Sequence, residues 1–83
     1  MNLHSILQNR QIIHSDPEIM SGVPVFVGTR VPLQTFFDYL DDEAGLSEFV
    51  TDYPYLKDPA IRVLEAIAQI MLSPQRNPNA YSA

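Results

Sequence analysis

The sequence predicts a mainly helical domain that contains a helix-turn-helix and a short N-terminal β hairpin. From residue 33 onward, apolar residues recur at the three- and four-residue spacing of amphipathic helices, and prolines separate the helical segments. Before residue 33, short apolar runs alternate with glycine and proline, which is typical of short strands and turns. The chain has 83 residues, enough for one domain around a single core.

Two short apolar runs predict the β hairpin. Residues 11–14 form the first run and residues 25–27 the second. The first strand could pair with the second or with the extended segment near Arg30. Between the runs, residues 15–18 read as a turn or a helix start that Asp16 could cap.

Glycine and proline fix the corner that leads from the second strand into the first long helix. Gly22 and Gly28 can take the positive φ that tight turns need. Pro24 holds its own φ near about −65° and favours an extended residue before it. Pro32 suits the first position of a helix, because its missing N–H would have no partner there.

The first long helix is predicted over residues 33–43, with Gly45 as its stop. Its apolar residues lie at i, i+3, i+4 and i+7. They are Leu33, Phe36, Phe37 and Leu40. Its second half is acidic, which opposes the helix dipole. These acids, Asp38, Asp41, Asp42 and Glu43, form either a solvated face or a docking surface for a basic partner.

Two further helices and the turn between them match a helix-turn-helix. Ser47 is expected to cap a short helix over residues 48–52, which Tyr53 and Pro54 end. Asp58 is expected to cap the third helix, which runs to about residue 72. In a helix-turn-helix, this last helix can enter the major groove of DNA.

The third helix is apolar nearly all round. Only Arg62, Glu65 and Gln69 interrupt its apolar residues, and they form one narrow polar stripe. Such a helix is normally buried, yet a chain this short cannot surround it. We therefore expect a second contact surface, made by self-association or by another protein. Alternatively, the exposed face of the helix needs no partner, because its alanines are small.

The chain is expected to form one domain with two short extensions. Residues 1–10 read as an N-terminal arm or short helix, residues 11–72 as the helix-turn-helix domain, and residues 73–83 as a mobile polar tail. No signal peptide and no membrane-spanning run is visible, so we expect a cytoplasmic protein without membrane association. There is no cysteine, which excludes disulfides and thiolate metal sites.

The charge of the chain argues against DNA binding by a single copy. The net charge is −5, and the five basic residues are spread along the sequence. Lys57 and Arg62 are the best candidates for phosphate contacts, and Gln69 is a candidate base contact. However, the end of the helix that usually reads bases carries Asp58, which phosphates would repel. Operator DNA is therefore expected to bind only a complex.

No enzyme, metal site or cofactor is predicted. The acidic residues are adjacent at a helix end, where they are normally solvated, and the two histidines lack ligand spacing. There is no glycine-rich phosphate loop and no calcium-binding loop. His14 beside Ser15 and Asp16 is not a triad, because neighbouring residues on a strand point to opposite faces.

The string IIHSDPEIMSGVPVFVGTRVP over residues 12–32, followed by Tyr39-Leu40 and by residues 49–54, resembles the prokaryotic "domain of unknown function 433" family. The resemblance covers about residues 11–68. It implies a homeodomain-like helix-turn-helix fold with a three-helix core and a small β element. It also implies an antitoxin of a type II pair, which neutralises a PIN-like ribonuclease toxin and represses its own operon with it. Residues 55–59 and the residues after Ala68 depart from the family pattern.

The resemblance singles out a set of signature residues, for which we expect a structural role. They are Asp16, Gly22, Pro24, Gly28, Thr29, Arg30 and Pro32. Arg30 could satisfy backbone carbonyls, pair with Asp16 or Glu18, or make a functional contact.

The partner or oligomer interface is predicted at the end of the third helix and in the tail. Its residues are Ile67, Ile70, Met71, Leu72 and Arg76. An arginine placed near toxin carboxylates would disturb their metal site by bidentate pairing. We expect homodimers or larger assemblies. The alternatives are a stand-alone DNA-binding regulator and a dimerisation module without a nucleic-acid role.

Overall fold

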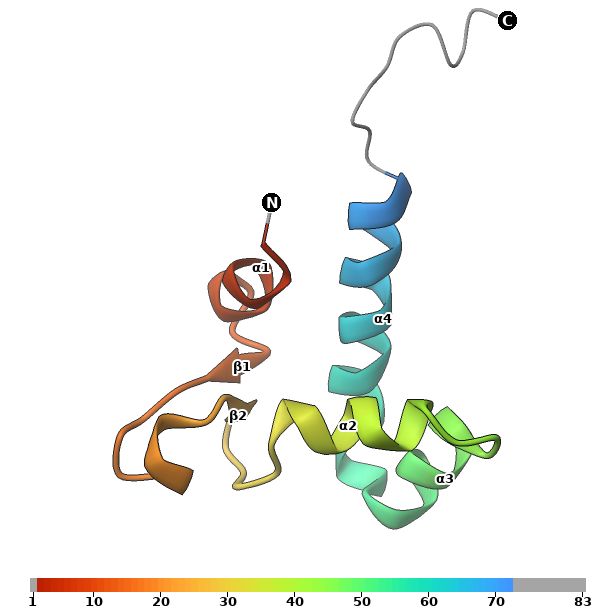
Figure 1. The fold of residues 1–83 in the computed structure, drawn as a ribbon, viewed down its shortest axis with the longest axis horizontal. Helices are drawn as coiled ribbons and strands as arrows, with labels where there is room; N and C mark the ends of the chain where they lie inside the picture. The colour runs from red at the N-terminus through yellow and green to blue at the C-terminus, as the bar shows by residue number, and fades with distance from the viewer. Residues whose placement is uncertain (1, 73–83) are drawn as a thin grey trace, which may run out of the picture.

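The chain is mainly helical, with four α-helices and one two-stranded antiparallel hairpin among the residues that the structure describes (Figure 1). The structure is a computed structural model, and it describes residues 2–72. Its elements in order are α1 (Leu3–Asn9), β1 (Ile13–His14), the 3-10 turn η1 (Met20–Gly22), β2 (Val25–Phe26), α2 (Leu33–Leu40), α3 (Gly45–Asp52), the 3-10 turn η2 (Pro54–Leu56) and α4 (Lys57–Leu72).

The predicted hairpin is confirmed, and its two strands are short. β1 pairs with β2 so that Ile13 lies opposite Phe26 and His14 opposite Val25. The first strand does not begin at Gln11, because that residue takes φ +59° in the turn after α1. The alternative pairing with the segment near Arg30 is therefore not the one formed. The N-terminal segment is a short helix, whose first N–H groups bind the side chain of Asn2.

Three phenylalanines join the hairpin to the helices. Phe26 of β2, Phe36 of α2 and Phe49 of α3 are fully buried. Their ring centroids lie 6.3 Å (Phe26–Phe36), 6.1 Å (Phe26–Phe49) and 4.7 Å (Phe36–Phe49) apart, within the range of favourable aromatic contacts. Leu7, Ile13 and Val63 are also buried in this core. The core therefore lies where the hairpin, α1, α2, α3 and the first half of α4 meet.

Helix α2 begins at Leu33, as predicted, and ends earlier than predicted. Pro32 is the N-cap and not the first helical residue, because its ψ of 146° is extended and it bridges Val25. The helix ends at Leu40, before three consecutive acidic residues that would oppose its dipole. Gly45 does not stop α2. It is buried with φ +39° and begins α3.

The caps predicted for the two later helices are also wrong. Ser47 lies inside α3, where its carbonyl accepts from the Thr51 hydroxyl, and the residue before α3 is Ala44. Asp58 does not cap α4, because η2 leads directly into a helix that already includes Lys57. The order helix, tight turn, helix is nevertheless the predicted one. The homeodomain-like arrangement stays a prediction.

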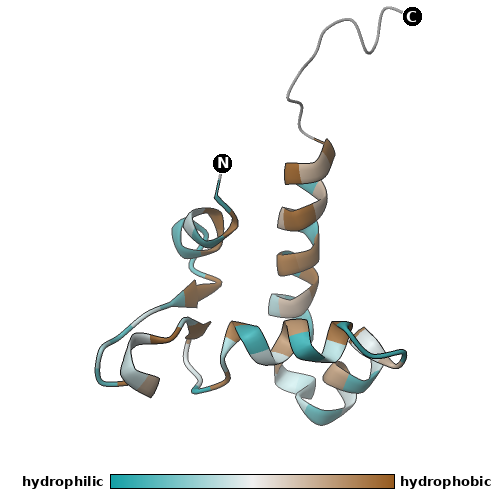
Figure 2. Ribbon diagram, in the orientation of Figure 1, coloured by the Kyte–Doolittle hydropathy of each residue, from teal (hydrophilic) through white to brown (hydrophobic). Residues whose placement is uncertain are grey.

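Within residues 2–72, only one face of α4 is covered by the other elements. Ala60, Val63 and Ala66 are buried, whereas Met71 is 79% and Leu72 76% exposed. Figure 2 shows apolar residues continuing to the end of α4, which extends beyond the layer formed by α2 and α3. No helix within residues 2–72 has the length and apolar character needed to cross a membrane.

A hydrogen bond between exposed parts of α2 and α3 gives a prediction about pH. The Tyr39 hydroxyl donates to Asp52 Oδ2 at 2.6 Å, and this bond raises the pKa of Tyr39 above its usual range, with desolvation and the negative charge of Asp52 adding to the effect. Because the bond needs the protonated phenol, its contribution to stability is fully present below about pH 10 and is lost as the pH rises further.

We expect Tyr39→Phe to lower the melting temperature at about pH 8, with the difference from the wild type shrinking above about pH 10. Thermal unfolding followed by circular dichroism measures the melting temperatures of the variant and the wild type at each pH. Tyr55→Phe at an exposed tyrosine is the matched control and should leave the melting temperature unchanged across this range. If the melting temperature of Tyr39→Phe differed from that of the wild type by the same amount at every pH, this account would be contradicted.

Candidate functional site

The residues predicted to contact DNA lie along α4 but do not share one face. Lys57 is the first residue of the helix, and Arg62 and Gln69 follow in its second and fourth turns. Arg62 and Gln69 are seven residues apart and lie on the same side, whereas Lys57 is turned away from Arg62 by roughly 140°. All three are exposed. The structure therefore brings two of the three together.

Gln69 already has a partner within the chain. Its Oε1 accepts a hydrogen bond from Arg10 Nη2 at 2.8 Å, which ties the end of α1 to α4. A base contact by Gln69 would have to compete with this bond. Sequence reasoning could not find the pair, because the two residues are 59 positions apart and neither shows a local pattern.

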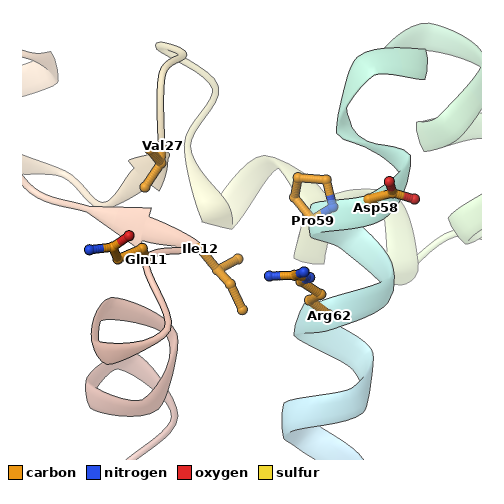
Figure 3. A pocket seen from close by; sticks show the side chains of 6 residues that line it. All are labelled: Gln11, Ile12, Val27, Asp58, Pro59 and Arg62. Atoms are coloured by element: carbon orange, nitrogen blue, oxygen red, sulfur yellow. The ribbon is translucent and has the colours of Figure 1, made fainter.

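Arg62 faces a cleft between the β hairpin and α4. The cleft has a volume of about 300 Å³, and Ile12 and Arg62 extend toward one another across it (Figure 3). Its lining residues are Gln11, Ile12, Val27, Asp58, Pro59 and Arg62. A second hollow of about 220 Å³ shares Ile12 and Arg62 and is also lined by Arg10 and Glu65.

The charges around the two hollows offset one another. Arg10 and Arg62 contribute two positive charges, and Asp58 and Glu65 contribute two negative ones. A phosphate group would therefore meet no net positive field here. Within residues 2–72, no group of three or more histidine, cysteine, aspartate or glutamate side chains is arranged to hold a metal ion.

The predicted interface residues divide into two groups. Ile67 is half-buried and packs against the core, and Ile70 is also half-buried. Met71 and Leu72 are free of the core and exposed. Arg76 lies outside the described residues. The sequence did not single out Ile61, which is 38% exposed on the same helix.

Three signature residues hold the turn before β2. Asp16 Oδ1 accepts from the Glu18 N–H at 2.9 Å, so residues 15–18 form a turn and not a helix start. Gly22 has φ +86°, and the two residues before it, Met20 and Ser21, also have positive φ. The Pro24 carbonyl accepts from Leu33 N at 3.0 Å and connects this loop to the start of α2.

The Gly28-Thr29-Arg30 segment closes the corner after β2. Gly28 has φ +80°, as predicted. The Thr29 hydroxyl donates to the Phe26 carbonyl at 2.9 Å and accepts from Val31 N at 3.0 Å. Arg30 is exposed. Its role, structural or functional, stays a prediction.

The signature residues lie within the region that matches a known family. Residues 13–68 match the family described as "Protein of unknown function (DUF433)". The chain belongs to the DUF433 family. The match runs from β1 through most of α4 and ends before Met71 and Leu72. No curated protein and no solved structure matches this DUF433 chain.

Thr29 offers a direct test of the structural role assigned to the signature. We expect Thr29→Val to lower the free energy of unfolding by about 1–2 kcal/mol, because Val31 N loses its acceptor in a half-buried place. Urea denaturation measures this value. Thr29→Ser keeps the hydroxyl and should retain most of the stability.

The matched control for Thr29→Val is the same change at Thr35, which is half-buried on α2. Thr35→Val should change the free energy of unfolding by less than about 0.5 kcal/mol. If Thr29→Val were as mild as this control, the hydroxyl would not be what holds the corner.

Proposed function

We propose that this DUF433 chain is the antitoxin of a type II toxin–antitoxin pair in the cytoplasm. It binds a PIN-like ribonuclease toxin and blocks it, and the complex represses its own operon. Membership of the family, together with the antitoxin role that the sequence resemblance implies, supports this proposal. No cofactor and no catalytic activity of the chain itself is part of it.

The observation that carries the proposal is the exposed apolar end of α4. Met71 and Leu72 are exposed by more than three quarters in the chain alone. Large apolar side chains grouped on a surface mark protein-interaction sites. An antitoxin works by covering its toxin, and this end of α4 offers a surface for that contact.

The distribution of charge also supports a basic partner. All six acidic residues of the segment 33–56 are exposed, and the segment contains no lysine or arginine. They are Asp38, Asp41, Asp42, Glu43, Glu48 and Asp52. A ribonuclease must hold RNA phosphates and therefore carries a basic surface. Attraction between the two surfaces would speed their association.

Operator binding is proposed for the complex and not for the single chain. Lys57 and Arg62 are exposed on α4, but Asp58 lies between them and the chain carries a net charge of −5. A basic toxin would supply the missing positive surface. The alternative, a stand-alone regulator, requires the purified chain to bind DNA with an affinity that falls steeply with salt.

Co-expression with the neighbouring gene product, which the proposal expects to be a PIN-like toxin, tests the antitoxin proposal. We expect the toxin alone to stop growth, the chain to restore it, and the two proteins to purify together. Colony counts and gel filtration of the tagged complex measure both effects. Unrelieved toxicity together with no complex would contradict the proposal.

The other two functions give different results in the same preparation. A stand-alone regulator would shift operator DNA without the toxin. A dimerisation module would form a stable dimer that binds neither DNA nor toxin.

A further inference from the structure

Helix α4 has two apolar faces, and the other elements of the described residues 2–72 cover only one of them. The covered face consists of Ala60, Val63 and Ala66, with Ile67 packed beside them. The second face is what we call the α4 stripe. It consists of Ile61, Leu64, Ala68, Met71 and Leu72. Of these, Leu64 is half-buried and packs against the core at the edge of the stripe, and the other four are exposed.

The spacing of the α4 stripe is that of a helix-pairing surface. Ile61, Leu64, Ala68 and Met71 are separated by three, four and three residues, so they line one side of the helix. Two helices pack along such a 3-4 repeat when both present it. Small Ala68 in the middle of the stripe allows a second helix to approach closely. The occupant that fits is therefore another helix with an apolar side.

Charge decides between a second copy of the chain and a different protein. The α4 stripe itself contains no charged residue, but the exposed Glu65 borders it, four residues after Ile61 and three before Ala68. In addition, each copy carries a net charge of −5, and the α2–α3 region is acidic and exposed. Two copies would repel one another, whereas a basic partner would be attracted.

We propose that the α4 stripe binds an apolar-sided helix on the basic PIN-like toxin. This inference rests on the proposed function and adds the surface and the kind of structural element that meet. It replaces Ile67 and Ile70 of the set predicted from sequence, which are half-buried, by the exposed Ile61 and Ala68. Met71 and Leu72 belong to both sets.

Met71→Glu is the test variant, and Met20→Glu is its matched control. Met20 is 49% exposed on η1, far from α4 in the sequence, and the substitution adds the same charge. Both variants make the chain more acidic, which by long-range attraction alone would tighten binding to a basic toxin. A weaker complex for Met71→Glu only would therefore report the loss of an apolar contact.

The measurement is the Kd for the purified, catalytically inactivated toxin, by calorimetry, together with growth rescue. We expect Met71→Glu to weaken binding by roughly 10- to 100-fold, the value of burying one large apolar side chain. Ala68→Glu, also exposed, should weaken binding similarly, and Met20→Glu should bind as the wild type does. Circular dichroism checks that each variant is folded.

The outcomes separate this inference from the antitoxin proposal. If the wild type neither binds nor rescues, the antitoxin proposal fails and this inference fails with it. If the wild type binds and Met71→Glu binds equally well, the antitoxin proposal stands and the α4 stripe is not the contact. A stable dimer of the chain alone that Met71→Glu dissociates would assign the stripe to a second copy and overturn the inference.

Discussion

The length of α4 relative to the size of the domain is the constraint on which the rest of the structure depends. α4 has 16 residues, most of them apolar, and the other elements are two short strands and helices of seven or eight residues. These elements can enclose one face of α4 only, around Ala60, Val63 and Ala66. A small domain has little stability to spare, so an uncovered apolar face is a cost that a partner can remove.

The aromatic core explains how so few residues hold this long helix in place. Phe26, Phe36 and Phe49 come from three different elements and meet in one cluster. The signature residues support that cluster indirectly, since the Thr29 hydroxyl fixes the corner beside Phe26. The signature residues thus fix the corner beside the aromatic core. The proposed toxin-binding surface lies on α4, which packs against that core.

Sequence patterns predicted the fold well where residues close in the sequence determine the local structure. Helical spacing identified α2, α3 and α4, and the positive φ of Gly28 followed from its place in the corner. The predictions were wrong where contacts with residues in other elements determine the local structure. Pro32 is held extended by its bridge to Val25, and Gly45, which is buried beside the end of α2 with φ +39°, begins α3 instead of stopping α2. The cleft at Arg62 and the Arg10–Gln69 bond join distant segments, so no local pattern could show them.

Amide hydrogen exchange along α4 tests the central claim most directly. If the other elements of residues 2–72 leave the end of α4 uncovered, amides near Val63 are strongly protected in dilute solution, and protection falls toward Met71 and Leu72. The gradient should not change with protein concentration and should disappear in the toxin complex. Uniform strong protection along α4 in the dilute chain alone would contradict the account, because the exposed end would then already be covered.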